Sequence, residues 1–126
     1  MNFEYKGENL HFDNLNLSKI ADVFGTPCYI YSRSLIESNF KEYQNAFGGR
    51  EHLVCYAVKA NSTLAIIKLL ADLGSGFDIV SGGELKRVIA AGGDPNKIVF
   101  SVRTHRNKIR VINQDKNYSH FQITYL

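Results

Sequence analysis

The 126-residue sequence has two cysteines, no tryptophan and no long apolar run. Cys28 and Cys55 lie inside apolar segments, without a CxxC partner or a histidine at metal-ligand spacing. Such scarcity argues against a disulfide-stapled secreted fold, and we expect both thiols to be buried. No stretch reaches the roughly 18 apolar residues of a membrane span, and the first residues lack a signal pattern. We therefore predict a cytoplasmic protein that makes no contact with a membrane.

Several catalytic and metal-binding motifs are also missing. The sequence has no G-x-S-x-G nucleophile elbow, no HExxH, no P-loop and no GxGxxG. The four histidines form no cluster in the sequence, so we predict no metal site. Any chemistry that this chain carries must come from other residue types.

The net charge of +3 is unevenly distributed along the chain. Residues 1–101 hold ten basic and eleven acidic side chains, whereas residues 102–126 hold five basic side chains and a single acidic one. A basic segment can contact nucleic acid, but this one has neither an aromatic-interleaved RNA motif nor zinc-ligand spacing. We therefore predict no nucleic-acid partner.

Helical and strand-like segments alternate along the chain, joined by short connections that contain glycine. We expect helices over 18–24, 34–47, 62–73 and 81–91, and strands over 28–31, 52–58, 77–80 and 97–100. Strict alternation of this kind predicts an α/β fold with a parallel sheet and crossover helices. An open doubly wound sheet and a (β/α)8 barrel both fit the pattern.

Lys59 follows directly on the apolar strand predicted over 52–58. In parallel α/β folds, ligands gather at the carboxyl ends of the strands. An amine placed there can be desolvated, so that it loses its proton more easily and attacks an aldehyde carbon. The plain alternative is a surface lysine on a loop, but a solvated lysine does not need a wholly apolar strand before it.

Two carboxylates fall near the same strand ends. Asp78 lies within a predicted strand, and because a buried carboxylate is rarely unpaired, we expect it to pair with the ammonium of Lys59. Its alternative role is to cap the loop after Gly76. Glu84 stands three residues after Ser81, the spacing of a capping box in which its carboxylate would accept the Ser81 N–H. The same position would also bring a carboxylate close to Lys59.

The neighbouring Gly82-Gly83 pair would lie at the start of a helix, where an anion could bind, but its spacing matches no phosphate-binding motif.

Five segments of the sequence resemble the fold-type III pyridoxal-phosphate decarboxylases, and most closely the subgroup that acts on diaminopimelate. They are YAVKAN at 56–61, FGTPCYIYS at 24–32, GSGFDIVSGGEL at 74–85, AAGG at 90–93 and KIVFS at 97–101. Alanine racemases share the fold but usually continue Ala-Asn-Ala-Tyr-Gly after their lysine, where Ala60-Asn61-Ser62-Thr63 stands here. Ornithine-type decarboxylases usually have cysteine in place of Ala60.

The resemblance implies the N-terminal part of a (β/α)8 alanine racemase-like TIM barrel that binds pyridoxal 5'-phosphate. Lys59 would hold the cofactor covalently, Asp78 would also contact it, and Asp78 and Glu84 would act as the catalytic carboxylates that orient it. The implied reaction is decarboxylation of an amino acid, which in the closest subgroup converts meso-diaminopimelate into L-lysine. The resemblance further implies a homodimer in the full-length family.

The resemblance stops after Ser101. The family normally continues there with Gly-x-Gly-Lys, but this chain continues with Val102-Arg103-Thr104-His105-Arg106. We therefore divide the chain into a barrel portion, residues 1–101, and a divergent basic tail, residues 102–126, which we interpret as the product of a shifted reading frame or a premature stop. A full barrel needs about 250 residues, so we expect an inactive fragment. The alternatives are a non-catalytic remnant and another fold-type III enzyme, of the ornithine/arginine decarboxylase or alanine racemase type.

Overall fold

The computed structural model of the chain describes residues 3–101. The tail predicted over residues 102–126 lies outside these described residues. The chain divides into two compact units, residues 1–39 and residues 40–126. Within residues 3–101, no helix is both long and apolar enough to cross a lipid bilayer.

The first unit opens with a small antiparallel sheet of β1 (Phe3–Lys6), β2 (Asn9–Phe12) and β3 (Leu15–Asn16). Asp13 and Asn14 join β2 to β3 as a two-residue turn, and both have positive φ, as tight hairpin turns of this length require. Phe3 and Phe12 are register partners across β1 and β2, and their rings stack 4.4 Å apart. Local turn chemistry and one aromatic pair therefore explain this sheet.

Helix α1 (Leu17–Phe24) follows directly on β3. Its N-cap is Asn16, whose side-chain oxygen accepts the Lys19 N–H at 3.2 Å, so the helix starts before the Ser18 that the sequence suggested. It ends at Gly25, which has a φ of 79°. The strand predicted over 28–31 does not form, and the Cys28 thiol is exposed instead of buried.

Helix α2 (Arg33–Ala46) starts one residue before the predicted N-cap Ser34. The cap is Ser32, whose hydroxyl oxygen accepts the Leu35 N–H at 3.0 Å. The helix belongs partly to each compact unit, since the boundary falls after Asn39.

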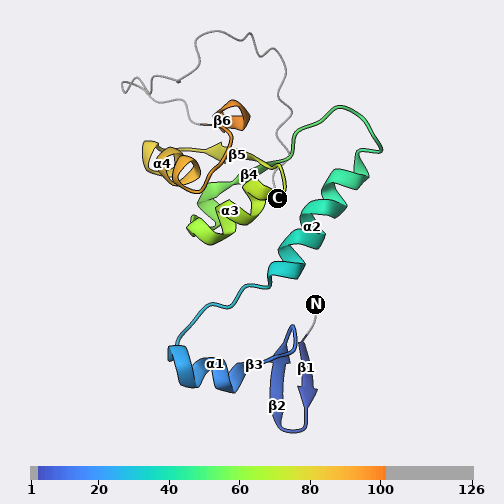
Figure 1. The fold of residues 1–126 in the computed structure, drawn as a ribbon, viewed down its shortest axis with the longest axis vertical. Coiled ribbons are helices and arrows are strands. Elements are labelled where there is room, and N and C mark those ends of the chain that lie inside the picture. Colours follow the sequence, from blue (N-terminus) through green and yellow to red (C-terminus); the bar gives the residue numbers. More distant parts are fainter. Residues whose placement is uncertain (1–2, 102–126) are drawn as a thin grey trace. The chain divides into compact units, whose positions relative to one another are not determined.

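The second unit contains a parallel sheet in the order β4 (Cys55–Ala57), β5 (Gly76–Ile79) and β6 (Ile98–Phe100). The short helix η1 (Val58–Ala60) and helix α3 (Leu64–Asp72) connect β4 to β5, and α4 (Gly82–Ala90) and η2 (Pro95–Lys97) connect β5 to β6 (Figure 1). Strands adjacent in sequence are adjacent in the sheet, which is the order that a (β/α)8 barrel uses.

Alternate residues of β5 serve the two faces of this sheet. Phe77 and Ile79 are fully buried and form the core together with Ile67 of α3 and Val88 of α4. Gly93 allows close packing here, because a Cβ at this position would lie 2.5 Å from Val88 Cγ1 and 3.1 Å from the Phe77 ring. The remaining face of β5 carries Asp78.

Candidate functional site

Lys59 is the middle residue of η1, two residues after Ala57, the last paired residue of β4. The register pairs Ala57 with Asp78, so Lys59 and Asp78 belong to the carboxyl ends of neighbouring parallel strands, as the sequence predicted. The expected desolvation of the lysine is wrong, because its side chain is exposed. The physical reason is that η1 continues beyond the paired part of the sheet, where flanking strands no longer cover it.

Three hydrogen bonds hold the backbone that follows Lys59. The Tyr56 hydroxyl donates to the Asn61 carbonyl at 3.2 Å, and the Asn61 side-chain oxygen accepts the Thr63 N–H at 2.9 Å. The Arg87 guanidinium of α4 donates to the Ser62 carbonyl at 3.3 Å. The turn after Lys59 is therefore held by both β4 and α4, which fixes the backbone position of the lysine.

Asp78 is the one charged side chain among the buried residues of the described part of the chain, with 5% of its surface exposed. Its carboxylate accepts a hydrogen bond from the hydroxyl of Ser101, just beyond β6. The Ser101 backbone N–H donates to the Ile79 carbonyl at 3.1 Å and so anchors that serine to β5. The predicted pairing of Asp78 with Lys59 stays a prediction.

Cys55 shares the face of the sheet on which Asp78 lies. The two positions are connected by register, since Cys55 pairs with Gly76 and Ala57 pairs with Asp78. Partial burial, and then the negative charge of Asp78, raise the pKa of the Cys55 thiol above its usual value of 9.0. Cys55 was also predicted to be a buried thiol, and its exposure is intermediate instead.

Glu84 has a structural role at the start of α4. Its Oε2 accepts the Val80 N–H at 2.6 Å, while its own N–H donates to the Ser81 hydroxyl oxygen at 3.2 Å. The second bond is the predicted N-cap, but the carboxylate takes the N–H of Val80 and not that of Ser81. The Glu84 carboxylate therefore holds the backbone just before α4, and neither of the two bonds involves Gly82 or Gly83.

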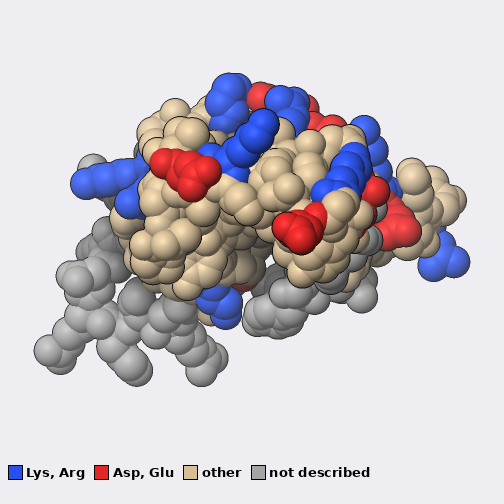
Figure 2. Space-filling model, turned by 90° about the horizontal axis from the view of Figure 1, so that it is seen from below, with Lys and Arg blue, Asp and Glu red and all other residues tan. Residues whose placement is uncertain are grey.

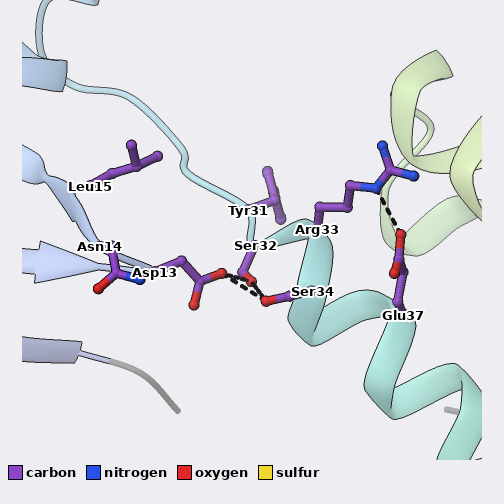
Figure 3. Close-up of a pocket in the computed structure, with 8 residues that line it drawn as sticks. All are labelled: Asp13, Asn14, Leu15, Tyr31, Ser32, Arg33, Ser34 and Glu37. Carbon is purple, nitrogen blue, oxygen red and sulfur yellow. Dashed lines mark hydrogen bonds and ion pairs between the residues drawn. The ribbon is translucent and has the colours of Figure 1, made fainter.

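A concave surface in the first unit is lined by Asp13, Ser32, Ser34 and neighbouring residues (Figure 3). The Asp13 carboxylate accepts hydrogen bonds from both serine hydroxyls, that of Ser34 at 3.0 Å. Ser32 at the same time caps α2. These polar groups satisfy one another, so this cluster fixes the start of α2 and offers no unpaired group to a ligand.

Among residues 3–101, no group of three or more His, Cys, Asp or Glu side chains is arranged to hold a metal ion. Acidic and basic side chains are interspersed on the face of the molecule shown in Figure 2. This mixture agrees with the near-balanced charge of residues 1–101.

Comparison with known families adds an independent observation to this geometry. A family described as "Pyridoxal-dependent decarboxylase, pyridoxal binding domain" matches residues 33–123, which is most of the chain. The chain belongs to this family. Pyridoxal phosphate is accordingly the cofactor of the family, and its chemistry is that of an amino-acid lyase. The match extends past residue 101, so the division of the chain at that residue stays a prediction.

Similar proteins define the relationship more closely within the pyridoxal-dependent decarboxylases. The chain is 57% identical over 99 residues to the diaminopimelate decarboxylase of Pseudomonas aeruginosa, covering 79% of this chain and 24% of that protein. It is 50% identical over 99 residues to the same enzyme of Haemophilus influenzae, again covering 79% and 24%. The chain thus spans about a quarter of the length of these relatives.

Solved structures confirm the predicted fold. The AQ1208 protein of Aquifex aeolicus superimposes with a TM-score of 0.74 at 45% identity, covering 78% of this chain and 24% of that one. A diaminopimelate decarboxylase from M. jannaschii, in a complex with L-lysine, gives a TM-score of 0.73 at 41% identity, with coverage of 78% and 24%. The described residues are therefore the N-terminal part of an alanine racemase-like barrel.

The residues at the sheet edge fit one end of the family cofactor. Lys59 supplies an amine, and Asp78 supplies a carboxylate on the neighbouring strand. The bonds of Glu84 at the start of α4 involve Val80 and Ser81 and leave the phosphate end of the cofactor unassigned. That these residues hold the aldehyde end of the cofactor stays a prediction.

Sequence reasoning missed Ser101, Tyr56 and Arg87. The contact of Ser101 with Asp78 depends on the register of β5 with β6, in which Asp78 pairs with Val99, two residues before Ser101, and the sequence does not give that register. Arg87 carries no sequence signal either, since its contact depends on how α4 lies against the turn after Lys59.

Proposed function

We propose that this chain is the N-terminal part of the pyridoxal-binding barrel of a diaminopimelate decarboxylase. The reaction is removal of one carboxylate from meso-diaminopimelate, which gives L-lysine. The observation that carries the proposal is the identity of 45% to 61% to proteins named diaminopimelate decarboxylase. Solved lysine decarboxylases are less similar, at 33% identity and a TM-score of 0.59 for the one from Selenomonas ruminantium.

Lys59 is the residue that we assign to cofactor attachment. It lies two residues after the end of β4, and the backbone that follows it is held by Tyr56 and Arg87. Pyridoxal phosphate, when bound, supplies an aldehyde for the amine and a ring that accepts the electrons left by the departing carboxylate.

We propose that Asp78 places a negative charge near the cofactor. It lies toward the carboxyl end of β5, and its carboxylate is held by Ser101. Glu84 supports the site indirectly, by holding the backbone where β5 passes into α4.

The 126-residue chain by itself is expected to have no decarboxylase activity. The described residues contain a parallel sheet of three strands, whereas a (β/α)8 barrel closes with eight. Lys59 is exposed, and an open sheet cannot exclude water from a reaction at this residue. We further expect the complete enzyme to be a homodimer located in the cytoplasm, as the resemblance implies.

A chimaera tests this function. Residues 1–101 replace the matching segment of the Pseudomonas aeruginosa relative, and CO₂ release is measured with meso-diaminopimelate, lysine, ornithine and arginine. We expect release from meso-diaminopimelate, none from the 126-residue chain alone, and loss of at least about 1,000-fold in the chimaera with Lys59→Ala. Lys68→Ala is the matched control, because Lys68 is exposed and pairs only with Asp72 along its own helix.

Two results would contradict the proposal. The first is a folded, cofactor-binding chimaera that releases no CO₂ from meso-diaminopimelate. The second is a chimaera whose activity survives Lys59→Ala.

A further inference from the structure

Ser101 lies where the sheet ends, and two separate bonds tie it to β5. Its backbone N–H donates to the Ile79 carbonyl at 3.1 Å, which continues the parallel pairing of β5 with β6 by one residue. Its hydroxyl donates to Oδ1 of Asp78. The backbone bond fixes the position of Ser101, and its hydroxyl is thereby placed to hold the Asp78 carboxylate.

Register explains why residue 101 is the one that reaches Asp78. Asp78 pairs with Val99 across β5 and β6, and side chains two residues apart on a strand share a face. Val99 is apolar and cannot donate a hydrogen bond, whereas the next residue on that face is Ser101. The serine is thus the nearest hydroxyl that this strand can offer.

The carboxylate needs this donor. Asp78 is 5% exposed and stands between two fully buried apolar neighbours in the strand. A buried carboxylate that lacks a hydrogen-bond donor costs several kcal/mol, so it turns toward water or takes up a proton when its donor is removed.

We propose that Ser101 is a positioning residue, whose hydroxyl fixes the Asp78 carboxylate on the face of the sheet that also carries Cys55. The other carboxylate oxygen of Asp78, Oδ2, is then available at the carboxyl end of the sheet, where Lys59 also lies. The claim about the carboxylate does not depend on a bound cofactor. Only the effect of Asp78 on Lys59 rests on the proposed function. The positioning of Asp78 by Ser101 and the function of Lys59 can therefore fail separately.

Cys55 provides a reporter for the carboxylate inside the same chain. The negative charge of Asp78 contributes to the raised pKa of this thiol, and thiolate is the form that iodoacetamide alkylates. The rate of Cys55 alkylation against pH therefore reads out where the Asp78 charge lies. Peptide mass spectrometry separates Cys55 from the exposed Cys28.

The experiment compares variants of the 126-residue chain, each folded and in urea. We expect the alkylation midpoint of Cys55 in the folded wild type to lie above its midpoint in urea. Asp78→Asn removes the negative charge, and Ser101→Ala frees the Asp78 carboxylate to move away or to take up a proton. Both variants should therefore lower the pH midpoint of Cys55 alkylation in the folded chain and speed alkylation at pH 8 by about threefold or more. Ser101→Thr keeps a hydroxyl and restores the wild-type profile, and Ser38→Ala, on an exposed position of α2, leaves it unchanged.

Three results would overturn the proposal. One is a Ser101→Ala profile identical to wild type while Asp78→Asn shifts. Another is a Ser101→Thr profile that follows Ser101→Ala and not wild type. The last is a folded wild type whose Cys55 titrates as it does in urea, which would mean that the carboxylate is not held beside the thiol.

Discussion

Gly76 is a residue with no room for a side chain. A Cβ atom there would lie 2.6 Å from the Cys55 sulfur and 2.8 Å from the carbonyl oxygen of Lys97. The second contact is with backbone of the neighbouring connection, which cannot move without disturbing the start of β6. Glycine at this position therefore lets β5 enter the sheet between β4 and β6.

Gly76→Ala is expected to lower the free energy of unfolding by about 1–3 kcal/mol, because the added methyl overpacks the sheet. Gly82→Ala is the matched control, since a Cβ at Gly82 meets no atom within 4 Å and the residue lies in α4. That variant should be neutral or slightly stabilising. Urea unfolding followed by circular dichroism measures both, and equal midpoints for the two variants would contradict this packing.

At the residue scale, the sequence identified the positions of Lys59 and Asp78 but not their surroundings. The apolar run before Lys59 correctly indicated the carboxyl end of a strand. It also suggested burial, whereas burial depends on strands and loops from elsewhere, and Lys59 is exposed. Asp78 shows the same limit, because its donor, Ser101, comes from a strand that is remote in sequence.

The helix α4 depends on its first turn. Ser81 accepts the Glu84 N–H, and Glu84 in return accepts the Val80 N–H at 2.6 Å. The two bonds satisfy the backbone N–H groups of Glu84 and Val80, and they fix the point at which strand β5 ends and helix α4 begins. This transition also determines where Arg87 lies relative to the turn after Lys59.

Ser81→Ala is expected to destabilise the chain by about 1 kcal/mol, the typical loss of an N-cap. Ser38→Ala removes a hydroxyl that bonds only within α2, on an exposed position, and should stay within about 0.5 kcal/mol of wild type. Equilibrium unfolding in urea provides both values. A Ser81→Ala variant as stable as Ser38→Ala would show that Glu84 alone holds this terminus.

At the element scale, most helices and the three parallel strands could be predicted from apolar periodicity and glycine stops. The starts of helices were less predictable, because neighbouring Ser, Thr and Asn residues compete for the N-cap, as Asn16 and Ser18 do before α1. The segment 28–31 has strand-like composition but pairs with no strand in the described part of the chain, so it forms no strand there. Strand β4 likewise starts only at Cys55, where its register with β5 begins.

At the scale of the whole molecule, the sheet β4–β5–β6 belongs to the N-terminal part of an alanine racemase-like barrel. Every strand in a complete barrel has neighbours on both sides, whereas among residues 3–101 the parallel sheet ends at β4 and at β6. Open strand edges favour association between chains. Family membership and the barrel fold could be predicted from sequence motifs, since the motifs with Lys59 and Asp78 lie at the carboxyl ends of β4 and β5.

The central claim is that Lys59 attaches pyridoxal phosphate, and trapping the bound cofactor in the chimaera tests it most directly. Borohydride reduction of the cofactor-loaded chimaera fixes a pyridoxyl phosphate group on the lysine that holds it, and peptide mass spectrometry locates that group. We predict the modification at Lys59 and its loss in Lys59→Ala, with Lys68→Ala modified like the parent. A cofactor trapped on another lysine, or an equal amount trapped in Lys59→Ala, would contradict the assignment.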